Sequence, residues 1–201
     1  EGLNRFVWDL GYPIMPGIPN VYIEAGYRGH AAPPGSYSIR LKVEDKEFIS
    51  RANILNNPLY EIDDDQYRSY DELMIEMEST LTQMHKKINR LYGIQQQLKA
   101  LINDLDDKAL KDSGDKLINA LDEWDKEMVQ RKAKAYDDVE NFKNKFTAEY
   151  LFLINQTEST IPRVNQSSID RKAALDSKWE TFNNQANEWI EKSIPEFNKQ
   201  L

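Results

Sequence analysis

Residues 69–105 read SYDELMIEMESTLTQMHKKINRLYGIQQQLKALINDL and carry the strongest structural signal in the chain. Apolar side chains recur there in alternating steps of three and four residues, and only Gln95 interrupts the series: Met74, Met77, Leu81, Met84, Ile88, Leu91, Leu98, Ile102 and Leu105. Such spacing places one apolar stripe along a single helix face. Ser69, with Glu72 three residues later, fits a capping box at the start of this helix. The stripe predicts a long helix that must pack against other helices.

Three further helical segments follow this one. Residues 108–134 keep the same apolar spacing, and residues 142–161 hold a nearly all-apolar run that should form the most buried helix. Residues 168–201 form the last segment, whose final turns Pro195 should kink or end. Because the connections are short, the simplest arrangement is an antiparallel up-down bundle of about four helices over residues 61–201.

Residues 1–60 have a different pattern, since they contain six of the eight Gly and six of the eight Pro. Apolar and polar residues alternate from Tyr37 to Val43, Glu44-Asp45-Lys46 is a polar break, and Phe48 to Leu55 form the returning strand, which predicts a β-hairpin over residues 36–55. Residues 5–10 predict another strand with Phe6 and Trp8 on one face, and residues 22–23 a short fourth one. Turns rich in Pro and Gly separate these segments.

The predicted fold class is therefore α+β and mainly α, with a small β part in residues 1–60 and a helical bundle in residues 61–201. An immunoglobulin-like sandwich has seven strands in ~100 residues. The three or four strands predicted here are too few for a complete one. Two alternatives explain this: a small sheet leans on the helices, or further strands precede residue 1, which makes the sandwich partial. Ten side chains are the expected structural anchors of the two parts: Phe6, Trp8, Tyr37, Leu41, Leu81, Leu91, Trp124, Phe146, Trp179 and Trp189.

Composition excludes several classes of function. The net charge of −8 and the pI near 4.9 argue against a nucleic-acid partner, which rewards clustered Lys and Arg. The chain has no Cys, so it cannot form disulfides, thiolate zinc sites or cysteine nucleophiles. It also contains no apolar run of the ~18–20 residues that a membrane span needs.

Candidate chemistry in the chain is sparse. The run Asp63-Asp64-Asp65 lacks the spacing and the Gly of a calcium loop and is more simply the acidic start of a helix. The only two histidines, His30 in a turn-rich loop and His85 on a polar helical face, do not form a metal motif. The sequence predicts no catalytic residue, cofactor or metal ligand. Trp8 has a second interpretation, as an exposed platform that stacks on sugars.

One stretch resembles a known family. The segment GLNRFVWDLGYP, residues 2–13, is similar to one that recurs near the C-terminus of large exported bacterial proteins, many of them from Bacteroidetes. Those proteins carry sortilin-type or sialidase-like repeat β-propellers and are often labelled glycosyl hydrolases. The Pro34-Gly35-Ser36-Tyr37 strand start, Asn57-Pro58 and the stretches Asn144–Phe146 and Leu151–Leu153 match the same pattern, whereas Gly11 stands where the family usually has Arg. The β part also resembles the immunoglobulin-like domain of flagellar-hook capping proteins.

The resemblance implies a function without catalysis. The leading hypothesis is a C-terminal scaffold or protein-interaction module of a larger exported propeller protein, with the upstream propeller as partner and an extracytoplasmic location. The alternatives are an independent helical adaptor or oligomerisation protein that pairs through its first helix and, more remotely, a fragment of a carbohydrate-active enzyme. No matched motif is catalytic, so the resemblance transfers no catalytic residue to this chain.

Overall fold

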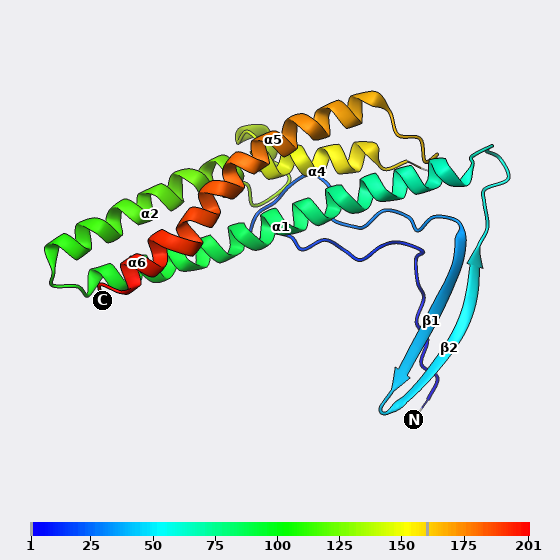
Figure 1. Cartoon of the computed structure of the whole chain (residues 1–201), viewed down its shortest axis with the longest axis horizontal. Helices are drawn as coiled ribbons and strands as arrows, with labels where there is room; N and C mark the ends of the chain where they lie inside the picture. Colours follow the sequence, from blue (N-terminus) through cyan, green and yellow to red (C-terminus); the bar gives the residue numbers. More distant parts are fainter. Residues whose placement is uncertain (1, 160) are drawn as a thin grey trace.

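The computed structural model describes residues 2–159 and 161–201 and shows a mainly α protein with one small antiparallel sheet. Figure 1 shows an elongated helical body, from one end of which a β-hairpin projects away. The hairpin consists of β1 (Gly35–Val43) and β2 (Lys46–Ile54), and it forms the only sheet of the described residues. The mainly α fold with a small β part is thus confirmed.

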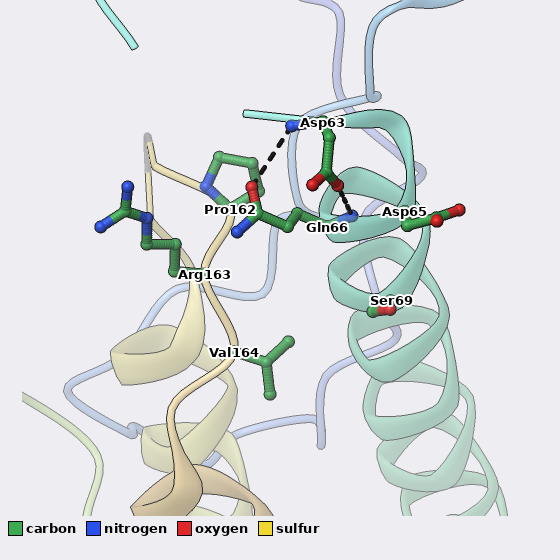
Figure 2. A pocket seen from close by; sticks show the side chains of 7 residues that line it. All are labelled: Asp63, Asp65, Gln66, Ser69, Pro162, Arg163 and Val164. Atoms are coloured by element: carbon green, nitrogen blue, oxygen red, sulfur yellow. Dashed lines mark hydrogen bonds between the residues drawn. The ribbon is translucent and has the colours of Figure 1, made fainter. Parts of the chain in front are cut away.

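The central element is α1 (Asp64–Asn103), a helix of 40 residues. It begins earlier than predicted, because Asp63 and Gln66 rather than Ser69 and Glu72 form the capping box. The Asp63 carboxylate accepts from the Gln66 amide at 2.7 Å and the Gln66 side chain accepts from the Asp63 amide at 3.3 Å (Figure 2). The predicted stripe is buried from Met74 to Ile102, as the spacing requires.

The remaining helices pack around α1. They are α2 (Lys108–Met128), the single turn α3 (Asp138–Asn141), α4 (Phe146–Thr157), α5 (Gln166–Glu188) and α6 (Ile194–Asn198). A π-helical turn, Trp189–Ser193, joins α5 to α6, so the helix continues through Pro195 instead of ending there. The prediction that α4 is the most buried segment is confirmed, since eight of its 12 residues are buried.

The arrangement of these helices does not confirm a four-helix bundle. In Figure 1, α2 lies along the C-terminal half of α1 and α4 along its N-terminal half, while α5 and α6 together follow most of its length. Gln95, the one polar residue of the α1 stripe, donates from its side-chain nitrogen to the Ile118 carbonyl and to Asp122 on α2, both at 3.3 Å. The interruption of the stripe therefore fixes how α1 and α2 align.

The first 34 residues differ most from the prediction. The described residues 5–10 and 22–23 form no strand, and the one β-type pairing in this segment is an isolated bridge between Gly11 and Ala31. Residues 11–32 instead lie on the helices, where Met15, Ile18 and Ile23 belong to the same hydrophobic core as the α1 stripe. Residues 11–32 thus share a hydrophobic core with the helices, and the described strands do not confirm an immunoglobulin-like sandwich.

Candidate functional site

The hairpin of residues 35–54, called the arm below, has one apolar and one polar face. β1 and β2 pair in register from Gly35 opposite Ile54 to Val43 opposite Lys46, across the two-residue turn Glu44-Asp45. Since side chains alternate between faces, one face collects the apolar members of both strands: Tyr37, Ile39, Leu41, Val43, Phe48, Ala52 and Ile54. The other face carries Ser, Asn, Arg, Lys and Glu, and Ile49 is its single apolar residue. The alternation is that of a sheet with one face in a core.

Apart from the contact of Tyr37 with Trp8, the apolar face of the arm is largely open to solvent in this structure. Ile39, Leu41, Val43 and Phe48 are 50%, 57%, 50% and 56% exposed. The described chain has 18 large hydrophobic residues that are exposed, and 13 of them lie in residues 3–60. Scattered exposed apolar residues are ordinary, but a continuous set of them marks an interaction surface. The arm and the segment before it therefore expose most of the large hydrophobic side chains that lie on the surface of the described chain.

The chain enters the arm through a small aromatic contact. The rings of Trp8 and Tyr37 lie 5.6 Å apart between centroids, the Tyr37 hydroxyl donates to the Pro33 carbonyl at 2.6 Å, and the Trp8 indole donates to the Gly11 carbonyl at 2.9 Å. Both side chains are only half-buried. Phe6, at 90% exposure, and Leu41 pack in no core, so the anchor role predicted for these two is wrong. Among the described residues, neither the helices nor a further strand covers these two side chains.

Next to the root of the arm lies a buried histidine clamp, formed by His30, Asp71, Glu78 and Tyr12. The His30 ring bonds to both carboxylates at 2.9 Å, through Nε2 to Asp71 and through Nδ1 to Glu78, and its side chain is fully buried. The His30 amide also donates to Glu78 at 2.8 Å, and Tyr12 stacks on the ring at 4.3 Å and donates to Asp71 at 3.2 Å. Sequence reasoning placed His30 in a loop and missed the clamp, because its partners lie 41 and 48 residues away.

The electrostatics of the clamp favour a charged histidine. Burial alone lowers the pKa of His30, but the hydrogen bonds and charges of Glu78 and Asp71 outweigh it and raise the pKa above 6.5. Burial and the bond to Asp71 raise the pKa of Tyr12 to about 12, so Tyr12 stays a hydrogen-bond donor. Two ring nitrogens facing two carboxylates need two protons on the ring. The charged His30 ring and the two carboxylates of α1 therefore form charge-assisted hydrogen bonds that hold the N-terminal segment on α1.

His85 is buried in the core, and its predicted place on a polar face is wrong. Its Nδ1 lies 2.6 Å from the Pro16 carbonyl, which makes Nδ1 the donor. Burial lowers the pKa of His85, and Nε2 has no partner among the described residues. The Tyr27 ring meets the imidazole edge-on at 5.7 Å. His85 thus holds the N-terminal segment on α1 as a neutral ring.

The helical anchors lie where the spacing placed them. Leu81, Leu91, Trp124, Phe146 and Trp179 are buried, and Trp189 is half-buried with its ring edge-on to Trp124 at 6.1 Å. None of these six side chains lines a hollow near the clamp.

The acidic run before α1 serves the helix start. Figure 2 shows the hollow between this end of α1 and residues 162–164, where the Asp63 carboxylate turns to the Gln66 amide. Asp65 pairs with Arg68 at 3.3 Å on the exposed side of the helix. No three Asp, Glu or His side chains of the described residues are placed to hold a metal ion. Among the helices that the structure describes, none is long and apolar enough to cross a membrane.

Comparisons of the chain with protein-family models, with curated proteins and with solved structures find no match.

Proposed function

We propose that this chain is a non-catalytic scaffold or protein-interaction module whose contact surface is the apolar face of the arm. The observation that carries the proposal is the concentration of exposed large hydrophobic side chains in residues 3–60, with four of them on one face of the arm. An isolated two-stranded hairpin is marginally stable in water, and three strands or a covering layer are needed to hold one. A partner that covers this face would supply the layer.

The size of the face indicates the kind of partner. Nine residue pairs at ~3.3 Å per residue and two strands at ~4.8 Å spacing give a face of roughly 300 Å². A stable interface buries about 800 Å² on each partner. The partner must therefore reach beyond the hairpin, and the exposed Leu3, Phe6 and Val7 extend the apolar surface in the segment that leads to Trp8. A broad apolar sheet, as in a sandwich completed by strands outside the described residues, fits this need.

The resemblance of residues 2–13 supplies the biological setting of the proposal. It favours a partner on the same polypeptide, a β-propeller of an exported bacterial protein, and an extracytoplasmic location. The helical body then serves as the rigid support, to which residues 11–32 tie the root of the arm through the histidine clamp.

A capture experiment with the full chain tests the proposal. The immobilised protein is incubated with extract of its source organism, beside a Leu41→Ser/Phe48→Ser variant that removes apolar surface from the arm face. Ile75→Ser is the control, because Ile75 on α1 is 41% exposed but lies on the helical body. We expect a protein captured by the wild type and the control and lost with the double variant. Equal capture by all three would refute the arm as the contact surface.

A further inference from the structure

The outer edge of β2 is a second, separate surface of the arm. Both strands of the two-stranded sheet have one open edge among the described residues. β2 runs for nine residues without Pro or Gly, so nothing in its sequence blocks the pairing of another strand. Figure 1 shows the arm pointing away from the helical body, with the N-terminal segment drawn alongside it.

The register of the hairpin fixes which backbone groups face outward. Val43 and Lys46 flank a two-residue turn, so this pair is hydrogen-bonded, and bonded pairs then alternate with non-bonded ones along the ladder. The amides of Glu47, Ile49 and Arg51 therefore point away from β1. Their side chains lie on the polar face of the arm, where Ile49 is 65% exposed.

We infer that β2 pairs with β2 of a second copy of this chain, antiparallel and centred on Ile49, so that the two arms form one four-stranded sheet. In that register Ile49 meets Ile49 of the second copy, and Glu47 meets Arg51 of the second copy twice, once on each side of the two-fold axis. This accounts for the one apolar side chain on the polar face. Opposite charges directly across an antiparallel pair are stabilising, and like charges there are destabilising.

Neighbouring registers match the charges of β2 less well. Centring the pair on Phe48 places Glu47 opposite Ile49 and leaves Arg51 opposite Asp45, which lies in the turn and outside the strand. Centring the pair on residue 50 places Glu47 opposite neutral Asn53 and Arg51 opposite Ile49, and centring it on Arg51 sets two like charges against each other. The charges of β2 thus select the register about Ile49. The inference rests on the proposed function, because both make the arm the contact surface. The self-pairing takes place at the edge of β2, so the apolar face stays free for another protein.

The absence of Cys from the chain gives a clean test of the register. Ile49→Cys puts two thiols beside the two-fold axis, whereas Ile39→Cys puts them on β1, away from it, at a comparable exposure of 50%. Under mild oxidation we expect the Ile49→Cys protein to form a covalent dimer at least tenfold faster than Ile39→Cys. Equal rates would overturn the inference.

A charge swap followed by sedimentation equilibrium tests the pairing without a crosslink. The contact is small, so the runs need high protein concentration. Arg51→Glu should weaken the dimer at least fivefold, because two acidic side chains then face each other at each end, and the double variant Glu47→Arg/Arg51→Glu should restore it. Arg51 is the residue changed first, because Glu47 also pairs with Arg40 inside the arm at 3.2 Å. Arg51→Pro removes an outward amide and should abolish association, while Arg51→Ala keeps that amide and should retain a dimer. A double variant as weak as the single one would contradict the register.

These results are separable from the proposed function. If the Ile49→Cys protein does not crosslink while Leu41→Ser/Phe48→Ser still loses its captured protein, the self-pairing is wrong and the contact face stands. If the capture experiment fails and the Ile49→Cys protein crosslinks, the arm serves self-association alone.

Discussion

Asn155 on α4 pairs with both backbone groups of Gly26: its side-chain oxygen accepts from the Gly26 amide at 3.0 Å, and its side-chain nitrogen donates to the Gly26 carbonyl at 2.9 Å. The side chain thereby acts as a neighbouring strand would. A backbone–backbone hydrogen bond, from the Tyr22 amide to the Ala133 carbonyl at 2.9 Å, attaches the same segment to the chain after α2. Residues 11–32 are therefore attached to the helices by polar bonds as well as by the buried Met15 and Ile18.

We predict that the arm and the segment before it contribute very differently to stability. Replacing residues 36–53 by a short Gly-Ser linker should leave the melting temperature almost unchanged, because none of their side chains is in the core. Deleting residues 1–34 should lower it strongly, since three buried side chains at ~1.5–3 kcal/mol each are lost and the α1 stripe is uncovered. Calorimetry on both proteins measures the difference. Equal losses would contradict the assignment of Met15, Ile18 and Ile23 to the core.

The clamp predicts a pH-dependent stability. Because the folded-state pKa of His30 is raised, its contribution is fully present below pH 6.5, the ordinary pKa, and is lost as the pH rises through the folded value. The free energy of unfolding, from urea titrations at a series of pH values, should therefore fall on the alkaline side. The His30→Gln variant should lose about 3 kcal/mol at neutral pH, because two largely buried carboxylates lose their partner. A His30→Gln protein with the same alkaline decline as the wild type would exclude His30 as its source.

Two helical glycines should respond oppositely to the same substitution. A Cβ added at Gly93 meets no atom within 4 Å, so Gly93→Ala should stabilise the protein by ~0.5–1 kcal/mol through helix propensity. A Cβ added at Gly114 would lie 2.6 Å from the Ile102 side chain and 3.2 Å from Phe197. Gly114→Ala should therefore destabilise despite the same gain in propensity. Urea unfolding of the pair gives the sign of each change.

Trp8→Ala should cost little global stability. The ring is half-buried and touches Tyr37 outside the hydrophobic core, so we expect a loss of ~1 kcal/mol or less rather than the ~3–5 of a buried aromatic. The change should instead appear as faster hydrogen exchange in residues 35–38, where the Trp8 contact supports the root of the arm. A loss of stability as large as that of a core residue would show that the segment before residue 10 packs more deeply.

Helix periodicity was sufficient to predict α1 and its buried stripe, because every stripe position repeats a local pattern. Helix ends were predicted less well, since Asp63 competes with Ser69 for the cap and the structure decides by which side chain reaches the free amides. The N-terminal segment was misread because Phe6, Trp8 and Tyr22 have strand propensity, yet no neighbouring strand binds them among the described residues. The clamp could not be predicted from the sequence. His30, Asp71 and Glu78 follow no common spacing and come together only in the tertiary fold.

The length of α1 has a mechanical consequence. At ~1.5 Å per residue, its 40 residues measure about 60 Å, with the arm beyond its first turn and α6 beside its last ones (Figure 1). A molecule held by the arm and one held near α6 would thus be kept some 60 Å apart by a stiff spacer. Inserting or removing whole heptads in α1 would reset that distance, whereas a single added residue would rotate one binding partner about the other by roughly 100°.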